Sequence, residues 1–323
     1  MISDNLLIHI GYHKTGSTWL QNELFISENN VFEPLSLKTA GRSALSWDFI
    51  KGQDGYLLSP FDSNKEVIKA SVLQILKQRR DRFSKVFVLS SERLSGQPSA
   101  GGFDASIIAN RLCDIFPKAK ILIVIREQRS YILSLYFQYL SKVSAGVLSL
   151  KRYLNIPYDR IPFFSPNNLN YKLLIEHYYE LFGKENILVL PYELFKSDPR
   201  DYINKIGFFV NREIEIDESR FMVYHNPNKG NFVLYYFRYL NFFIKRTSLN
   251  YFSIFANKYS RYLAICLQST LMLLTPKLID KWFNKRVKKY IHNWVGDRYE
   301  LSNSKLSQLI NIDLSKYGYH KPS

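Results

Sequence analysis

Short apolar runs alternate with segments of helical period along the first two thirds of the chain. The β-branched and aromatic runs predict buried strands, and these lie at 6–10, 85–91, 120–125 and 187–191. Apolar residues at helical spacing predict helices at 19–25, 67–78, 105–116, from about 130 onward, 169–182 and 199–209. Residues 29–64 have neither period and are expected to be irregular. The alternation predicts an α/β fold in which right-handed crossovers build a central parallel sheet between two layers of helices.

The alternation stops after His225. Aromatic and basic residues then recur at helical spacing over 232–245, 252–275 and 278–294. We therefore expect a core domain over residues 1–226 and a helical C-terminal extension over residues 227–323, packed on that core. The uncharged stretch from Tyr262 to Pro276 is shorter than the roughly 20 residues that a spanning helix needs, so it is expected to be a buried helix.

Charge is concentrated in the same C-terminal part. The chain carries a net charge of +16, and the part from Pro227 to Ser323 holds 16 Lys and Arg against 4 Asp and Glu. Such an excess predicts an acidic partner, which leaves a polyanionic glycan, an anionic lipid surface and a nucleic acid open. A solvated basic face that aids solubility is an equally good interpretation.

The cysteines and the N-terminal residues indicate in which cellular compartment the protein is expected. Cys113 and Cys266 give neither a disulfide framework nor a metal-ligand cluster, which fits a reducing cytoplasm. The first residues have no basic segment ahead of an apolar one, so no secretory signal is expected. We expect a cytoplasmic protein, with peripheral contact at the inner membrane surface as a further option.

The segment Leu6–Leu20 predicts a strand, a phosphate-binding loop and a helix. Gly11 and Gly16 permit a tight turn, and Ser17 and Thr18 fall where the first amides of a helix point at an anion. Lys14 adds a positive charge. In the P-loop of nucleotide triphosphatases the lysine follows the second glycine, whereas here it precedes that glycine, so a different phosphate-binding loop is expected.

Ionisable and aromatic side chains follow the other predicted strands. Glu92, Arg126 and Tyr192 each lie within a few residues of a strand end, as Lys14 does. Because ligands of open α/β sheets bind outside the carboxyl ends of the strands, we expect these four residues at one edge of the sheet.

At this point the sequence resembles sulfotransferases that use 3′-phosphoadenosine 5′-phosphosulfate (PAPS). Lys14-Thr-Gly-Ser-Thr-Trp19 is similar to their 5′-phosphosulfate loop, and Ile123-Val-Ile-Arg126 with Ser134 is similar to their 3′-phosphate motif. A third block, Leu188-Val-Leu-Pro-Tyr-Glu193 followed by Asp198-Pro199, also matches. The tail from Leu301 to Tyr319 resembles the end of bacterial sulfotransferases, particularly those thought to modify glycans.

The resemblance implies a role for each matching residue. The residues that it implies for binding PAPS are Lys14, Thr15, Gly16, Ser17, Thr18, Trp19, Arg126, Ser134, Tyr192 and Lys229. Within this set, Trp19 and Tyr192 would approach the adenine, although a core tryptophan is the usual alternative for Trp19. Lys229 stands in Asn226-Pro-Asn-Lys-Gly230, where many cytosolic sulfotransferases have Arg-Lys-Gly, so part of the 3′-phosphate contact is missing.

The implied reaction moves a sulfuryl group from PAPS to an acceptor hydroxyl, leaving the product 3′-phosphoadenosine 5′-phosphate (PAP), without a metal. Lys14 would neutralise charge on the leaving phosphate oxygen. Glu92 is the expected base, and His13 is a weaker candidate. We expect a saccharide or glycan as the acceptor and no specific nucleic acid as a partner. A P-loop-type kinase and a non-catalytic protein that binds polyanions or membranes remain alternatives.

Overall fold

The structure is a computed structural model of the 323-residue chain. It describes residues 5–35, 38–39, 42–43, 59, 61–62, 65–79, 84–143, 146–155, 164–223, 230–244, 255 and 258–322. The chain folds into two compact units that each combine separate stretches. The first contains residues 1–127, 167–225 and 300–323, and the second contains residues 128–166 and 226–299. These units are defined by contacts between residues and not by position in the sequence. The expected boundary at 226/227 between a core domain and a C-terminal extension therefore stays a prediction.

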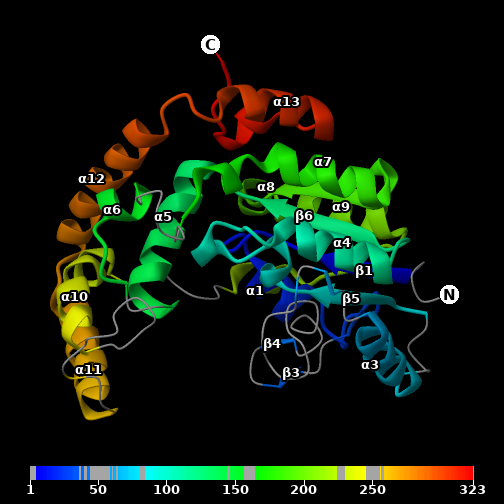
Figure 1. Cartoon of the computed structure of the whole chain (residues 1–323), viewed down its shortest axis with the longest axis horizontal. Coiled ribbons are helices and arrows are strands. Elements are labelled where there is room, and N and C mark those ends of the chain that lie inside the picture. The colour runs from blue at the N-terminus through cyan, green and yellow to red at the C-terminus, as the bar shows by residue number, and fades with distance from the viewer. Residues whose placement is uncertain are drawn as a thin grey trace. The chain divides into compact units, whose positions relative to one another are not determined.

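A parallel sheet forms the centre of the first unit (Figure 1). Among the described residues it contains five strands in the order β2-β5-β1-β6-β7, and every neighbouring pair is parallel. The strands are β1 (Leu6–His9), β2 (Phe32–Pro34), β5 (Val86–Ser90), β6 (Lys120–Ile125) and β7 (Ile187–Pro191). The predicted α/β fold with a central parallel sheet is therefore confirmed, and four of these strands lie where the apolar runs predicted them.

The edge strand β2 corrects the expectation that residues 29–64 are wholly irregular. A short hairpin of β3 (Lys38–Thr39) and β4 (Arg42–Ser43) follows it. The sequence did not indicate β2 because it is only three residues long and ends at Pro34. Proline lacks an amide hydrogen and is tolerated at sheet edges, which is where β2 lies.

Helices of the first unit lie between the strands and after the last strand, β7. They are α1 (Ser17–Trp19), which continues as a π-helix over Leu20–Leu24, α3 (Lys65–Lys77), α4 (Ala105–Ile115), α7 (Tyr171–Phe182), α8 (Tyr192–Ser197), α9 (Pro199–Val210) and α13 (Glu300–Ile310). Asp198 caps α9 by accepting a hydrogen bond from the Asp201 amide at 2.9 Å. Aspartate is one of the residues that favour this capping position.

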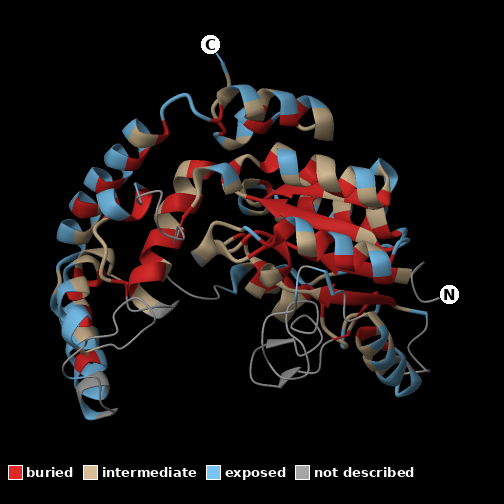
Figure 2. Cartoon of the chain, in the orientation of Figure 1, coloured by how far each residue is buried: buried red, intermediate tan, exposed pale blue. Residues whose placement is uncertain are grey.

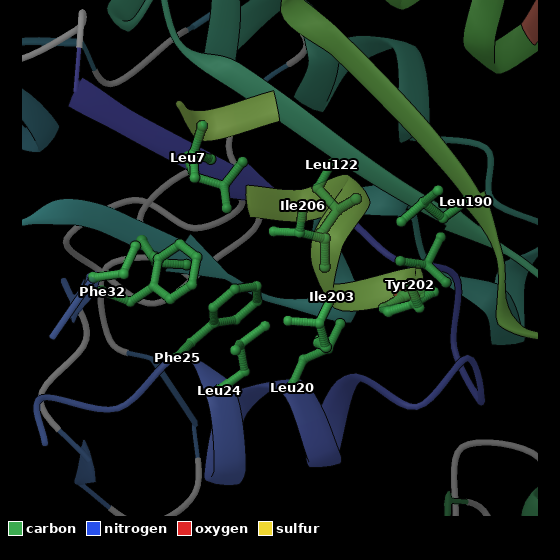
Figure 3. Packing of buried hydrophobic residues seen from close by; sticks show 14 of the residues in the cluster. Leu7, Leu20, Leu24, Phe25, Phe32, Leu122, Leu190, Tyr202, Ile203 and Ile206 are labelled. Carbon is green, nitrogen blue, oxygen red and sulfur yellow. The ribbon is translucent and has the colours of Figure 1, made fainter. Parts of the chain in front are cut away.

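Side chains from alternate strand positions pack under α9 and the first helix. Figure 3 shows Leu7, Leu122 and Leu190 from three strands facing Ile203 and Ile206 of α9. The intervening strand residues point to the opposite face and are also buried, for example Ile121 and Ile123 at 0% exposure. Burial of both faces is the reason why these strands read as continuous apolar runs.

The second unit is helical in its described residues. It contains α5 (Gln128–Gln138), α6 (Leu150–Leu154), α10 (Asn231–Ile244), α11 (Lys258–Leu274) and α12 (Lys277–Val295). The helices predicted after His225 are thereby confirmed where they are described. The expectation that the uncharged stretch Tyr262–Pro276 is buried is wrong, because most of its side chains are exposed. Helix α12 packs against α5 and α10 through Phe283, Val287 and Ile291. In the described part of the chain no single helix is long and apolar enough to cross a bilayer, although the bent pair Tyr262–Leu274 and Lys277–Val295 passes by length and composition together.

Candidate active site at the carboxyl edge of the sheet

The loop between β1 and α1 has a left-handed backbone at two positions. Gly16 has φ 83° and Lys14 has φ 66°. A side chain other than glycine rarely adopts such a φ, and local strain of this kind collects at functional sites. Gly16 also packs against Tyr192, because a Cβ at Gly16 would lie 2.8 Å from Tyr192 Cε2. The loop thus presents Lys14 directly ahead of a helix that begins without a side-chain cap.

Polar atoms of three residues pack closely around Gly11. A Cβ placed there would be 2.6 Å from His9 Nε2, 3.0 Å from Thr15 Oγ1 and 3.2 Å from Ser17 Oγ. Thr15 Oγ1 donates to the carbonyl of Tyr12, whereas Ser17 Oγ is buried without a hydrogen-bond partner among the described residues. A buried hydroxyl without a partner needs one. A hydroxyl donor next to the uncapped start of a helix suits a phosphate.

The side chain of His9 lies against Gly11. This side chain is fully buried, and His9 Nδ1 and Ser90 Oγ share a hydrogen bond of 2.7 Å. Gln21 Nε2 donates to the same Ser90 hydroxyl at 3.1 Å. Burial lowers the pKa of His9 from 6.5 to about 3. His9 is therefore a neutral ring that links β1, β5 and the first helix beneath the loop.

Burial of neutral His9 makes stability depend on pH. The unfolded state binds a proton below about pH 6.5 and the folded state does not until about pH 3, so the free energy of unfolding falls as pH drops through this range. When the pH falls from 7 to 5, we expect His9 to lower the free energy of unfolding by about 2 kcal/mol. Urea titrations should show His9→Gln losing less stability over that interval than the native chain. Equal losses in the two proteins would contradict a buried neutral His9.

Arg126 follows β6 and contacts the loop directly. Its Nη1 donates to the carbonyl of Lys14 at 2.7 Å, and its guanidinium carbon lies 5.3 Å from the centre of the Tyr192 ring. Lys196 Nζ lies 4.7 Å from the same ring. Lys14, Arg126 and Tyr192 come from three strand ends, as the sequence predicted, and the structure brings them together.

The sequence did not reveal the residues that hold Arg126 in place. The hydroxyl of buried Tyr171 donates to the carbonyl of Arg126 at 2.6 Å. The next amide, of Glu127, donates to Glu193 Oε1 at 3.1 Å, and Tyr319 Oη lies 3.3 Å from Glu193 Oε2. Burial raises the pKa of Glu193. No short-range pattern could predict these contacts, since Tyr319 is 126 residues from Glu193.

Trp19 is packed inside the first unit and is 5% exposed. Its ring lies 4.5 Å from that of Phe195 and stacks on Phe221 at 5.8 Å. Its Nε1 donates to the carbonyl of Arg220 at 3.0 Å. In this state the tryptophan is a core residue, which is the alternative that the sequence left open, and a contact with adenine stays a prediction.

Glu92 begins a 3₁₀ turn after β5 and lies beside the loop. Its Oε2 is 3.9 Å from His13 Nε2. Burial first, and then the charges of Arg93 and Lys14, lower the pKa of His13 from 6.5 to about 3. Arg93 itself pairs with Asp104, whose Oδ1 also accepts a hydrogen bond from the Gln97 amide at 2.8 Å. The structure thus brings both candidate bases to the same edge of the sheet.

The roles of two further residues, Ser134 and Lys229, stay predictions. Ser134 lies on α5 in the second unit and is half-buried. Lys229 lies outside the described residues. Within the described residues, no group of three or more His, Cys, Asp or Glu side chains is placed to hold a metal ion.

Comparison with known proteins gives one family. A sequence profile of the sulfotransferase domain matches residues 4–231. A search of curated proteins found no significant match. Among solved structures, a sulfotransferase from Alicyclobacillus acidocaldarius is 16% identical and covers 97% of this chain and 98% of its own, with a TM-score of 0.52. This likeness supports the fold.

Other sulfotransferase structures are more distant. A sulfotransferase domain from the curacin biosynthetic pathway is 15% identical over 69% of this chain and 78% of its own, with a TM-score of 0.39. The mouse sulfotransferase SULT7A1, solved with PAP, is 13% identical over 68% of this chain and 62% of its own, with a TM-score of 0.35.

The domain match spans most of the chain and contains the loop at Lys14, the 3₁₀ turn at Glu92 and the strand end at Arg126. The chain therefore belongs to the sulfotransferase domain family and is a sulfotransferase, an enzyme whose family takes the sulfuryl group from PAPS and leaves PAP.

Proposed function

We propose that this sulfotransferase acts on a hydroxyl of a saccharide or glycan, with Lys14 and Glu92 as its catalytic residues. The observation that carries the proposal is the meeting of three strand ends: Arg126 Nη1 lies 2.7 Å from the Lys14 carbonyl, and Glu92 lies beside His13 of the same loop. A phosphate-binding loop, a guanidinium and a carboxylate then face one reaction centre.

Bound PAPS supplies the sulfuryl group, and its S–O bond to the 5′-phosphate breaks as the acceptor oxygen bonds to sulfur. Lys14 stabilises the negative charge that grows on the released phosphate oxygen, an interaction of the oxyanion-hole kind. Two features fix the backbone from which the Lys14 side chain extends. They are its left-handed conformation and the hydrogen bond from Arg126 to its carbonyl. A lysine that is in place before the reaction has to move less as the transition state forms.

Glu92 accepts the proton of the acceptor hydroxyl. A general base works best when its pKa is close to the working pH, and the lowered pKa of His13, about 3, makes that ring a poor proton acceptor at neutral pH. This favours Glu92 between the two bases that the sequence left open.

Donor binding uses the loop and Arg126. Thr15, Gly16, Ser17 and Thr18 hold the 5′-phosphate through the start of the helix, with the buried Ser17 hydroxyl as one donor. Arg126 offers two parallel donors for the 3′-phosphate. A contribution of Ser134 and Lys229 to 3′-phosphate binding stays a prediction. Tyr192 and Trp19 border the adenine.

A polyhydroxyl acceptor suits the surroundings of Glu92. Arg93, Asp104 and the Gln97 amide form a polar network next to it, and Phe103 in the same loop is 63% exposed. The tail that resembles glycan-modifying enzymes is part of the same unit, where Tyr319 contacts Glu193. We keep the cytoplasm as the expected compartment.

The test is transfer of ³⁵S-labelled sulfate from PAPS to a panel of oligosaccharides, glycolipids, phenols and steroid alcohols. The proposal expects labelled product with saccharides and none with the other alcohols. Labelling of phenols or steroids alone would overturn the acceptor class but not the sulfotransferase assignment.

Gly11→Ala should weaken donor binding, because the added methyl group would lie only 2.6 Å from His9 Nε2 and so displace the loop. We expect the affinity for PAP, measured by calorimetry, to fall at least about tenfold, since a shifted loop misplaces several hydrogen bonds to phosphate. Ser17→Ala removes one donor without adding bulk and should cost less. Retained cooperative unfolding of Gly11→Ala shows that the effect is local. Unchanged affinity would mean that the packing around Gly11 does not hold the phosphate-binding loop in place.

A further inference from the structure

The helix α11 exposes apolar side chains on most of its surface. It packs on α10 through Ala264 and Met272, which occupy one narrow side. The other sides of α11 carry large apolar residues that are exposed, namely Tyr262, Leu263, Ile265, Leu267, Leu271, Leu273 and Leu274. At 3.6 residues per turn these side chains cover roughly 240° of the helix circumference. Figure 2 shows the exposed residues spread along α11 and α12.

An apolar surface this wide points to lipid. A helix that packs on a globular neighbour buries a stripe of about 100°, and a second protein docked on α11 would leave the rest uncovered. Lipid chains can contact a helix from several sides at once. The uncharged stretch Tyr262–Pro276 extends only about 22 Å at 1.5 Å per residue, against the roughly 30 Å of a hydrocarbon core. The helix is therefore suited to lie in the interface rather than to cross it.

Cations follow directly on α12, which turns from α11 by 99°. Lys277, Lys281, Lys285 and Lys288 line one hollow on the surface of α12, together with exposed Leu278 and Trp282. The hollow also contains Asp280. The Phe232 amide donates to Asp280 Oδ1 at 2.8 Å, and Asn284 donates to its Oδ2 at 3.0 Å. The carboxylate is thus engaged by α10 and by its own helix.

We propose that α11 and the lysine-lined side of α12 form a docking surface for an anionic phospholipid bilayer. The apolar side chains of α11 enter the boundary between headgroups and acyl chains, Trp282 lies at headgroup level, and the four lysines contact lipid phosphates. This surface belongs to the second unit alone, and its use does not depend on the acceptor proposed above.

The test is cosedimentation of the full chain with vesicles of phosphatidylcholine containing 30% phosphatidylglycerol. We expect binding that weakens at high salt and is much lower on pure phosphatidylcholine. Lys281→Gln with Lys285→Gln should lower the partition coefficient about 25-fold, at about fivefold for each lysine. Leu273→Ser with Leu274→Ser should lower it at least about tenfold. The matched control, Lys118→Gln with Lys184→Gln, removes the same charge from exposed sites of the first unit and should change it little.

Several results would overturn the proposal. The first is no binding of the native chain to the anionic vesicles, and the second is an equal loss of vesicle binding in the control variant Lys118→Gln with Lys184→Gln. The third is a Leu273→Ser, Leu274→Ser variant that changes the oligomeric mass and keeps vesicle binding. The fourth is a Lys281→Gln, Lys285→Gln variant that loses only heparin binding. The affinity for PAP is measured on every variant and should stay at the native value. Failure of vesicle binding with intact PAP binding would reject this surface and leave the donor site standing.

Discussion

Lys14→Ala should lower the turnover number about 10²- to 10³-fold, the usual loss when one donor to a developing oxyanion is removed. The left-handed backbone of Lys14 and the hydrogen bond from Arg126 to the Lys14 carbonyl fix the backbone that carries the ammonium group. No other ammonium group takes that position when Lys14 is removed. PAP affinity should fall much less, since the loop amides and hydroxyls remain. Single-turnover release of PAP from PAPS, with acceptor and with water in its place, measures the effect on the leaving group in both reactions.

Lys118→Ala is the matched control for Lys14→Ala, because Lys118 is an exposed lysine of the same unit. It should turn over at the native rate. A Lys14→Ala enzyme that releases PAP within threefold of the native rate would remove Lys14 from the chemistry.

Glu92→Gln should lower transfer about 10²- to 10⁴-fold, the range expected when a general base is lost. The amide keeps the size and polarity of the side chain, so PAP affinity should stay within twofold. His13→Asn should cost less than tenfold, because a ring with a pKa of about 3 contributes little as a base.

Glu66→Gln serves as the control for the Glu92 variant, since Glu66 is exposed on α3. If His13→Asn abolished transfer while Glu92→Gln preserved it, the roles assigned to these two residues would have to be exchanged.

The fold could be predicted from the sequence because both faces of the sheet are buried. Strands such as Lys120–Ile125 are then continuous apolar runs bounded by polar residues. Local signals also mark helix boundaries, since Asp198 caps the start of α9 and Gly183 follows the last residue of α7. The three-residue edge strand at Phe32–Pro34 has no such signal, and the pairing with β5 decides its conformation.

The site could be predicted only as far as it follows strand ends. Lys14, Glu92 and Arg126 each stand directly after a strand or its loop, so topology places them at one edge. The side chain of His9 could not be assigned, since its environment depends on Ser90 of a neighbouring strand. The burial of Trp19 likewise depends on Phe195 and Phe221, which are remote in sequence.

The central claim is that one pocket holds two phosphates of one nucleotide, the 5′-phosphate on the loop at Lys14 and the 3′-phosphate on Arg126. Calorimetric affinities for PAP and for adenosine 5′-monophosphate, on the native chain and on Arg126→Ala, test it most directly. Arg200→Ala, at an exposed arginine paired with Glu218, is the control. We predict that Arg126→Ala weakens PAP strongly and the monophosphate little, so that the variant no longer distinguishes the two. An equal loss for both nucleotides, or no loss for either, would contradict the assignment of the 3′-phosphate to Arg126.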